Sequence, residues 1–509
     1  MSEQQKKASD FCGSLPIHHI NSIQDYGYLI VLDVNSLDII QLSENFATLT
    51  GKTLTDLIRL NLSDFCTEAS SGAVKDVIEE GNRDRVPLNV ELQTVNGIQV
   101  FNTLLHVKQE YVLMEMELAD QKVLRPFTEV FREVRQFIAA LEHNSTIQEV
   151  CDNAIREIRR ISGFDGVRMY SFDADWNGTV IAEEITEGLE AYLGQTFPAS
   201  DVPRQARALY VKNPFRLIPD RAYKAVRLYP VINPVTNAFI DLSDCNLRGI
   251  APVHLEYMAN MNVVASMSIR VMRGNTLWGL ISCHHLERNC PDAELRYIFE
   301  WLSMEISNRI SAVLDNEELS GAAHLLAKRS LVTDHIYAKD DIMDGILQDE
   351  NLNVLSLFNA SGVLVKLAGK VDCRGIVPEK HDLENLLLWV ESKEIDQLYS
   401  NYHLGDVYEE ATGFDDVACG ILVIPIDGNN GDYVICFRPE LVRDINWGGD
   451  PNQTIKFEQN SERYHPRNSF KSWMETVYGQ SLKWSDAELN VAESLRNFLF
   501  EFRTKQLYK

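Results

Sequence analysis

A long apolar stripe in the middle of the chain constrains the fold more than any other feature of the sequence. It predicts one amphipathic helix over residues 292–318, about 27 residues and roughly 40 Å long at 1.5 Å per residue. Such a helix often joins two domains or pairs with a second copy. The alternative is a helix whose stripe faces the core of a single domain. The stripe repeats at spacings of 4, 3, 4, 4 and 3 and consists of Leu295, Phe299, Leu302, Ile306, Ile310 and Val313.

The length and composition of the chain indicate several soluble globular domains. Its 509 residues predict three or four domains, with 45% hydrophobic and 24% charged residues. No apolar run reaches the roughly 18 residues that a membrane span needs. The first ten residues lack the apolar region of a signal peptide. We therefore expect a cytoplasmic protein with no membrane partner.

The nine cysteines do not indicate a disulfide framework or a metal site. Their number is odd and no C-x-x-C pair occurs, so we expect no metal and mostly buried, inert thiols. Cys12 differs because it lies in a polar N-terminal arm, before the first strand pattern. By position alone, such a terminal cysteine is usually incidental.

Residues 20–118 have the pattern of a small α+β domain. Short strands around short helices are typical of a PAS-type sensor domain, although this pattern is weak evidence by itself. The expected helices are 54–60 and 73–80, and the expected strands are 27–33, 39–42, 88–92, 99–106 and 111–118.

The next region has the pattern of a GAF-type domain. It opens with one long helix over 126–160 and continues with strands at 166–172 and 179–185. After a long insertion come strands 263–272 and 278–285, with Arg273-Gly274-Asn275 as a plausible hairpin turn. The insertion is long enough to enclose a ligand.

Residues 330–480 repeat the strand-rich pattern and predict a second GAF-like domain. A long polar stretch between 438 and 484 is either disordered or functional. The chain ends in a helix from Ser485, its expected N-cap, to about Lys509, with an apolar seam at Leu495, Phe498 and Phe502. The strands expected before the polar stretch are 354–358, 364–368, 420–425 and 433–438.

A basic island occupies residues 197–230 of this acidic chain. Seven cations against two carboxylates give a net charge of +5, whereas the whole chain carries −26 and has a pI near 4.9. An island of this kind suggests a small anionic ligand, and the alternative is a solvated helix face balanced by acids elsewhere. The overall acidity argues against nucleic acid as a partner. The cations are Arg204, Arg207, Lys212, Arg216, Arg221, Lys224 and Arg227.

The island begins at a run with two prolines around one carboxylate, Pro198-Ala199-Ser200-Asp201-Val202-Pro203. Proline restricts the backbone, so the carboxylate stands on a segment that moves little. This run resembles the chromophore-pocket motif of the phytochromes. Other segments extend the resemblance over nearly the whole chain to the photosensory module of a bacterial phytochrome, with PAS, GAF and PHY domains in tandem. They are Arg248–Tyr257, Ser266–Ser268, Trp278–His285, Trp447–Gly449 and Pro466–Phe470, together with Cys12 in the arm.

The sequence departs from the family pattern at two places. The family's usual Q-P-H-G after the attachment cysteine is here Gln24-Asp25-Tyr26-Gly27, which concerns the packing where the N-terminal arm threads the GAF domain. The pocket motif has Val202 where isoleucine is commoner, which is a harmless change.

The resemblance implies an α+β fold of antiparallel sheets joined by long helices. The implied parts are an arm at 1–19, a PAS domain at 20–120, a GAF domain at 126–315, a PHY domain at 316–484 with a tongue at about 438–480, and a signalling helix at 485–509.

The resemblance also implies a cofactor, biliverdin IXα, attached by a thioether at Cys12. Arg216 and Arg248 would hold a propionate, because a guanidinium fork matches a carboxylate. Ser266 and Ser268 would hold the other. The remaining implied roles are His254 at the pyrroles and a propionate, His284 at the ring D carbonyl, Asp201 at the pyrrole nitrogens, and Tyr170, Tyr210, Tyr257, Phe197, Val202, Pro203 and Met261 as lining residues.

The implied function is a red/far-red photoreceptor that catalyses nothing but its own attachment. Light would isomerise the bilin, and the tongue, with Trp447, Pro466, Arg467 and Ser469, would refold between strand and helix. Arg467 would pair with Asp201 in one photostate. The long helices would pair in a parallel homodimer and signal to a C-terminal output domain, a histidine kinase or a diguanylate cyclase.

Two other functions are weighed against this one. A GAF-type sensor of a non-bilin anion, such as a cyclic nucleotide, would use the same basic island but has no role for Cys12 or the tongue motifs. An enzyme using Cys12 or His254 lacks any supporting catalytic order, phosphate loop or metal spacing. A change of colour under red light in the presence of biliverdin would separate the three.

Overall fold

The structure, a computed structural model, describes residues 17–81, 85–119, 127–347, 353–451, 455–457, 464–466 and 470–507. The chain divides into two compact units. The larger is Met1–Val313 with Asn446–Trp473, and the smaller is Leu314–Ile445 with Met474–Lys509. Within the described ranges, no helix combines the length and the apolar character that crossing a membrane requires.

The first sheet of the larger unit has seven strands in the order β1-β11-β3-β2-β6-β5-β4. Short helices pack on one face around Phe46, Val74 and Phe101, as the sequence predicts for 20–118. The strands are β1 (Ser22–Ile23), β2 (Tyr28–Asp33), β3 (Ile39–Ser43), β4 (Val86–Thr94), β5 (Gly97–Val107), β6 (Tyr111–Leu118) and β11 (Val226–Tyr229), and the helices are α2 (Asn45–Thr50), α3 (Leu54–Leu57), η1 (Leu62–Asp64) and α4 (Glu68–Glu79).

One strand of this sheet comes from the region expected to form the next domain. β11 lies between β1 and β3, with Ser22 opposite Arg227 and Leu228 opposite Ser43. The first two domains are therefore joined through a shared sheet. The sequence analysis missed β11, because a four-residue strand carries too short an alternation to be recognised.

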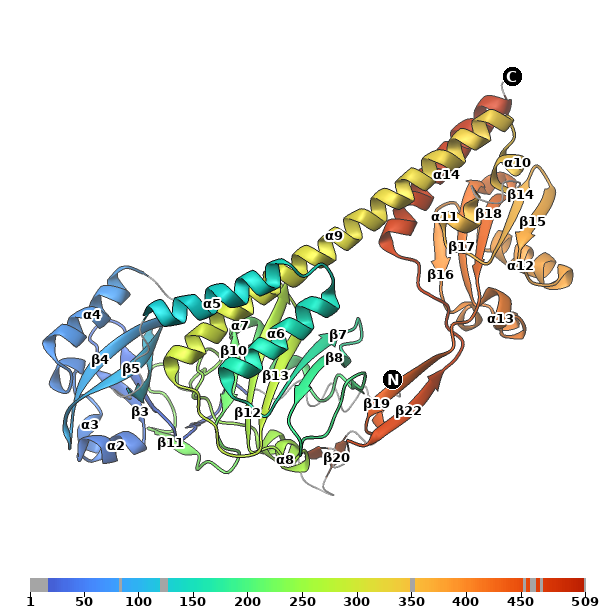
Figure 1. The fold of residues 1–509 in the computed structure, drawn as a ribbon. Coiled ribbons are helices and arrows are strands. Elements are labelled where there is room, and N and C mark those ends of the chain that lie inside the picture. The colour runs from blue at the N-terminus through green and yellow to red at the C-terminus, as the bar shows by residue number, and fades with distance from the viewer. Residues whose placement is uncertain are drawn as a thin grey trace. The chain divides into compact units, whose positions relative to one another are not determined.

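The second sheet of the larger unit runs in the order β10-β12-β13-β7-β8-β9-β19-β22. Helices α5, α6 and the first part of α9 lie on one face of this sheet (Figure 1). On that face Ser303 of α9 donates to the Arg270 carbonyl at 2.7 Å. The helices and the strands of this sheet are α5 (Phe127–Glu142), α6 (Ile147–Ser162), β7 (Gly166–Phe172), β8 (Gly178–Ile185), β9 (Thr196–Phe197), α7 (Arg204–Lys212), β10 (Phe215–Ile218), α8 (Pro252–Asn260), β12 (Ala265–Arg273), β13 (Thr276–His285), α9 (Ala293–Lys339), β19 (Arg443–Gly448) and β22 (Ser472–Val477). Strands β20 (Ile455–Phe457) and β21 (Tyr464–Pro466) pair in a separate two-stranded sheet.

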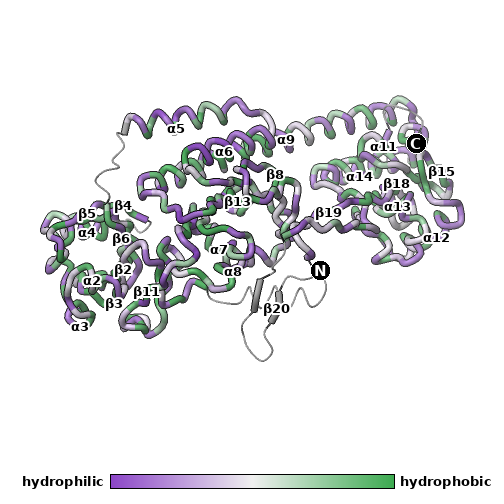
Figure 2. Tube along the Cα trace, turned by 60° about the horizontal axis from the view of Figure 1, so that its bottom comes forward, coloured by the Kyte–Doolittle hydropathy of each residue, from purple (hydrophilic) through white to green (hydrophobic). Residues whose placement is uncertain are grey.

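The mid-chain helix is longer than its stripe predicts. α9 spans 47 residues and continues past Glu318 to Lys339. Gly321 does not stop it, because nothing crowds that position and most of the following residues are good helix formers. Its hydropathy alternates along its length (Figure 2). All six stripe residues are at most 8% exposed within the larger unit, so the core-facing alternative holds and the stripe is not a free dimerisation seam.

The helix expected over 126–160 is two helices. α5 ends at Glu142 and α6 begins after Thr146. Thr146 caps α6 in a capping box with Glu149, whose carboxylate accepts from the Thr146 amide at 3.2 Å. This box starts a new helix within a stretch whose apolar periodicity hardly changes.

The smaller unit contains a five-stranded sheet in the order β15-β14-β18-β17-β16, with apolar cores on both faces. The strand expected at 354–358 is instead a helical turn, α11 (Val354–Leu357), capped by Asn353. A short apolar run cannot be assigned to strand or helix by periodicity alone. The other elements are α10 (Ile342–Leu347), β14 (Gly362–Leu367), β15 (Lys370–Gly375), α12 (Lys380–Ser392), β16 (Tyr399–Asn401), η2 (Leu404–Asp406), η3 (Glu409–Gly413), α13 (Asp415–Ala418), β17 (Gly420–Asp427), η4 (Gly428–Asn430) and β18 (Asp432–Arg438).

The terminal helix α14 (Asp486–Leu507) begins where the sequence predicts. The Ser485 hydroxyl accepts from the Glu488 amide at 3.3 Å, which confirms the expected N-cap. The seam residues Leu495 and Phe502 are buried in the core of the smaller unit, and Phe498 packs against that core. The expectation that this seam needs a second copy to cover it is therefore wrong, because the unit's own sheet covers it.

Candidate ligand-binding pocket

One face of the second sheet is polar, and strand pairing explains why. Ser266 of β12 lies opposite His284 of β13, and Ser268 lies opposite Ser282. Arg216 of β10 is opposite Ser268 on its other side. Because side chains alternate along a strand, these polar groups share one face of the sheet, and the helices cover the other.

The opposite wall of this space comes from α7, α8 and the turn before α7. Pro203 is the N-cap residue of α7 and Pro252 begins α8, so prolines set both helix starts. The Tyr257 hydroxyl donates to Asp201 Oδ2 at 2.8 Å, which joins the turn to α8. The wall thus holds the carboxylate of the sequence motif in a defined place.

A cavity of about 250 Å³ lies between the two walls, near the lower end of the volumes typical of small-molecule sites. Every predicted pocket residue that the structure describes lines it, and apolar side chains such as Ile250 and Met258 supply much of the remaining lining. Cys12 lies outside the described residues. The predicted residues brought together are Tyr170, Phe197, Asp201, Val202, Pro203, Tyr210, Arg216, Arg248, His254, Tyr257, Met261, Ser266, Ser268 and His284.

Two arginines of the cavity wall have no carboxylate partner among the described residues. Arg216 donates only to backbone carbonyls, those of Asn246 at 2.7 Å, of Arg248 and of Gly249 at 3.2 Å. Arg248 is 7% exposed, and burial followed by the charge of Arg216 lowers its pKa to about 9. A buried cation beside a half-buried one favours an anionic ligand, because a carboxylate would compensate both.

Two histidines of the cavity are held neutral. Burial, followed by the charge of Arg216, lowers the pKa of His254 to about 4. The ring of His254 is accessible, but it lines the cavity wall, so we attribute its exposure to the cavity and treat the ring as desolvated. Burial, followed by Arg168 and His254, lowers the pKa of His284 to about 3.

Arg168 of β7 supports His284 and was not predicted from the sequence. Its guanidinium donates to His284 Nδ1 at 3.1 Å, so the ring proton lies on Nε2, 2.9 Å from the Ser282 hydroxyl. Arg168 itself is compensated by Glu183, at 2.6 Å from Nε to Oε1. Its position two residues before Tyr170 on the same strand face is the signal that could have revealed it.

Most of the basic island does not face the cavity. Of its seven cations only Arg216 lines the pocket. Arg207 donates to the Val202 carbonyl at 2.6 Å, and Arg221 donates to that of Val263 at 2.7 Å. Most members of the island therefore do not serve the pocket, and Arg248, outside the island, is its second cation.

Residues of the tongue pack at one side of the pocket as strands. Trp447 of β19 pairs in parallel with Thr196 of β9. The centroid of the Phe470 ring lies 5.0 Å from the centroid of the Tyr257 ring, and the two rings pack edge to face in a cluster with Phe197. Pro466 belongs to β21, whereas Arg467 and Ser469 lie outside the described residues.

The segment Gln24–Gly27, which departs from the family pattern at Asp25 and Tyr26, lies where the chain crosses between the first two domains. The Gln24 amide donates to the Leu247 carbonyl at 2.8 Å, and its side chain donates to that of Leu217 at 3.0 Å. Tyr26 is near the guanidinium of Arg296, 5.8 Å from the ring centroid. The segment is thus held by the contacts of Gln24 and by the partly buried ring of Tyr26.

The described residues contain no group of three or more His, Cys, Asp or Glu side chains that could hold a metal ion. The polar groups of the cavity are donors and acceptors suited to an organic anion rather than to a metal.

Models of three protein families match successive parts of the chain. They are the PAS fold at residues 12–119, the GAF domain at 146–312 and the phytochrome region at 325–507.

Curated relatives match almost the whole chain. Cyanobacterial phytochrome B of Nostoc sp. is 34% identical over 96% of the chain, and the chain spans 65% of its length. A bacteriophytochrome of Xanthomonas campestris is 31% identical over 96% of the chain, which covers 77% of that protein.

Two solved structures have the same fold. A bacteriophytochrome from R. palustris superimposes with a TM-score of 0.86 at 32% identity, covering 97% of this chain and 99% of that one. The photosensory core module of the Stigmatella aurantiaca phytochrome gives a TM-score of 0.82 at 31% identity, covering 97% and 98%.

Proposed function

The chain belongs to the phytochrome family, and on that premise we propose that it is the photosensory module of a bacterial phytochrome, a photoreceptor that binds a bilin and responds to red and far-red light. The observation that carries the proposal is the pair Arg216 and Arg248. Arg248 is buried and Arg216 is half-buried, neither has a carboxylate partner in the described part of the chain, and both lie on the wall of a largely apolar cavity. A bilin offers both an apolar conjugated body and carboxylates.

The pocket residues have definite parts in this proposal. Arg216 and Arg248 would hold one propionate, and Ser266 and Ser268 the other. His254 would contact the pyrroles, Asp201 would face their nitrogens through its carbonyl, and the other lining residues would enclose the ring system. His284 would donate to the ring D carbonyl through the nitrogen that now faces Ser282. The bilin, when bound, supplies the light-absorbing system and a double bond that light isomerises.

We propose biliverdin IXα as the bilin, with a thioether at Cys12. The domain limits proposed are those expected from the sequence: 1–19, 20–120, 126–315, 316–484 and 485–509. The matched PAS model begins at residue 12, inside the proposed arm, and the phytochrome-region model extends to residue 507, through most of the proposed signalling helix. Strand β11 also joins the first two domains into one sheet.

Isomerisation would act on the tongue through the aromatic contacts at its docking site. Phe470 and Trp447 rest against the elements that carry Tyr257 and Phe197, so a changed ring contact at these side chains would weaken the strand form. We further propose that Arg467 pairs with Asp201 in one photostate.

A cytoplasmic homodimer that signals to a C-terminal kinase or diguanylate cyclase completes the proposal. Since the apolar stripe and seam are buried, dimer contacts would instead use exposed apolar residues of α9. These are Trp301, Met304, Leu319, Leu326, Leu331 and Tyr337.

The proposal is tested by expressing the chain with biliverdin. We expect a coloured protein whose absorption changes reversibly under red and far-red light. Zinc-induced fluorescence on a denaturing gel should mark the wild type and not Cys12→Ala. A colourless wild-type protein would contradict the photoreceptor function. Equal fluorescence of both proteins would contradict only the attachment site.

The same arginine pair would also suit a sensor of a non-bilin anion such as a cyclic nucleotide. Binding of a cyclic nucleotide by calorimetry, with no uptake of biliverdin, would favour that alternative. The aromatic and apolar lining and the tongue contacts favour the bilin.

A further inference from the structure

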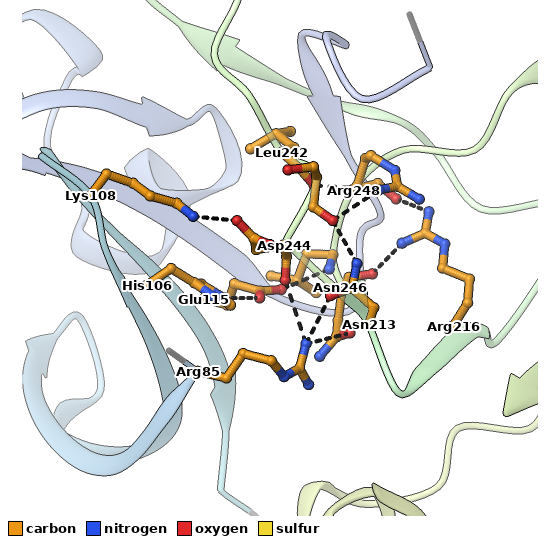
Figure 3. Close-up of polar contacts among 12 residues, drawn as sticks. Arg85, His106, Lys108, Glu115, Asn213, Arg216, Leu242, Asp244, Asn246 and Arg248 are labelled. Atoms are coloured by element: carbon orange, nitrogen blue, oxygen red, sulfur yellow. Dashed lines mark hydrogen bonds and ion pairs between the residues drawn. The ribbon is translucent and has the colours of Figure 1, made fainter. Parts of the chain in front are cut away.

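The segment Leu242–Arg248 carries Arg248 to the pocket. The side chain of Arg248 makes few contacts that could fix its own position. Within the described part of the chain, its guanidinium has two acceptors, the carbonyls of Leu242 at 3.4 Å and Ser243 at 3.5 Å. Both belong to the same segment (Figure 3). The position of this cation is therefore set by whatever holds the segment's backbone.

The segment is held by the PAS-type sheet as well as by the domain that contains the pocket. Leu242, Cys245 and Leu247 are buried in one cluster with Leu113 of β6. Two residues further along β6, Glu115 Oε2 accepts from the Leu247 amide at 2.8 Å. This hydrogen bond acts on the residue directly before Arg248.

Glu115 is itself fixed in place. Its second oxygen, Oε1, lies 2.6 Å from His106 Nε2 of β5, and the side chains are 5% and 2% exposed (Figure 3). Burial opposes ionisation of Glu115, but the hydrogen bonds from His106, Leu247 and Cys245 and the charge of His106 outweigh it and lower its pKa. A buried carboxylate thus faces the segment from across the domain boundary, where its charge also favours protonated Arg248.

Further contacts hold the outer side of the segment and do not reach the Leu247 amide. Lys108 of β5 pairs with Asp244, and Arg85 donates to the Asp244 carbonyl at 3.5 Å. Asn213 donates to the Ser243 carbonyl at 2.6 Å. At the end next to Arg248, the Gln24 amide donates to the Leu247 carbonyl at 2.8 Å, and Arg216 donates to the carbonyls of Asn246 and Arg248. Among the described residues, Glu115 is the side chain that accepts from the Leu247 amide.

We infer that Glu115 is a positioning residue for the ligand pocket: through the Leu247 amide it sets the place of Arg248, so that a domain outside the pocket determines how strongly a ligand carboxylate is bound. The inference rests on the proposed function only in naming that carboxylate as a propionate of a bilin.

The test measures reversible binding of biliverdin to the full chain in a Cys12→Ala background. Glu115→Ala should raise the dissociation constant about tenfold, the effect expected for one displaced charge-assisted contact. Glu115→Gln keeps an acceptor for the Leu247 amide and should restore affinity to within about threefold. Glu117→Ala is the matched control, because Glu117 is on the same strand and paired with buried Arg296 at 2.5 Å, away from the segment.

A double-mutant cycle separates positioning from general stabilisation. With Arg248→Ala already present, Glu115→Ala should weaken binding no further. Binding of biliverdin dimethyl ester, which lacks the carboxylates, should be insensitive to Glu115→Ala. Additive losses in the cycle, or equal losses for Glu115→Ala and Glu117→Ala, would overturn the inference while leaving the proposed function intact.

If biliverdin does not bind at all, the proposed function is overturned. Hydrogen exchange of the ligand-free chain then still tests whether Glu115 holds the Leu247 amide. The Leu247 amide should exchange at least tenfold faster in Glu115→Ala than in the wild type or Glu117→Ala. Equal rates would overturn the role of Glu115, and the Gln variant provides the same comparison if the Ala variant does not fold.

Discussion

The two GAF-like sheets of this protein each bury an arginine, and the two arginines are treated in opposite ways. Arg438 of the smaller unit donates to Glu488 at 2.5 Å and to the Phe358 carbonyl at 2.7 Å. It also lies 3.7 Å above the ring of Trp484. Arg248 of the larger unit has two long contacts to carbonyls and no carboxylate partner in the described chain.

The surrounding side chains differ in the same way. Apolar cores fill both faces of the five-stranded sheet, and Val363, Leu364 and Val365 are all buried along β14. The sheet with the pocket instead presents Ser266 and Ser268 at alternate positions of β12. A buried charge that the protein compensates stabilises the fold, whereas one left uncompensated beside a cavity is available to a ligand.

The largest effect that would test this comparison is expected for Arg438→Ala. Removing Arg438 leaves the largely buried Glu488 without its cation, although Ser485 still donates to its other oxygen, and leaves the Phe358 carbonyl without this donor. This should lower the free energy of unfolding of the smaller unit by about 3 kcal/mol. Calorimetry of the ligand-free chain measures it as a fall in the melting temperature of one transition. Arg496→Ala, which removes the partly exposed pair with Glu493, is the control and should cost under about 0.5 kcal/mol. Similar melting temperatures for both variants would remove the distinction.

The second-largest effect is expected for Arg248→Ala, and it is a loss of ligand affinity rather than a loss of stability. It removes an uncompensated cation, so the ligand-free chain should melt at or above the wild-type temperature. Biliverdin affinity should fall by about 1.5–3 kcal/mol, one to two decades, because a charge-assisted contact is lost. Binding titrations and melting curves of the same samples check both parts. A large loss of stability without ligand would mean that Arg248 is structural, as Arg438 is.

A smaller effect is expected for Gly448→Ala, which tests whether the tongue packs against the pocket domain as strands. A Cβ at this position would stand 2.7 Å from the Phe197 ring, so the strand must shift. We expect a cost of about 1 kcal/mol or somewhat more to the docked tongue. It should appear as altered photoconversion and reversion kinetics with chromophore uptake unchanged.

Gly72→Ala is the control for this change, since nothing crowds that position of α4. Kinetics of Gly448→Ala equal to those of the control would show that the contact with Phe197 is unimportant.

The smallest effect at neutral pH is expected for His284→Gln. The folded pKa of His284 is about 3 and the unfolded value is near 6.5, so the unfolded chain takes up the proton first. The stabilising contribution of the neutral ring is complete above about pH 6.5 and is lost as the pH falls toward 3. His284→Gln should therefore make the unfolding free energy of the ligand-free chain less sensitive to acid between these values.

Denaturant titrations from pH 7 to pH 4 measure that slope. His381→Gln, at an exposed position of α12, serves as the control for loss of a histidine. A slope unchanged from the wild type would contradict the desolvated, neutral state of His284.

The pocket was accessible to sequence reasoning because its residues occur in short motifs. Ser266 and Ser268, two positions apart in a strand, indicate a polar face of a sheet. A carboxylate between Pro198 and Pro203 indicates a rigid turn. Arg168 was missed because a single arginine in an apolar strand is not part of a recognisable motif. The sequence also does not show which basic residues reach the cavity, because nothing in their sequence context distinguishes Arg207 from Arg216.

The sequence alone determined the strand alternation, the cap at Ser485 and the presence of long amphipathic helices, because each depends on neighbours a few positions away. Most of the pocket residues followed from the resemblance of short motifs to those of the phytochromes. Only the tertiary structure decided that β11 completes the first sheet, that the apolar stripe and seam are covered within the monomer, and that Glu115 holds the Leu247 amide across 132 positions of sequence. It also decided that Arg438 is paired and Arg248 is not. Covalent spacing sets which side chains share a face, but whether a buried charge meets its partner depends on the packing of segments that are distant in the chain.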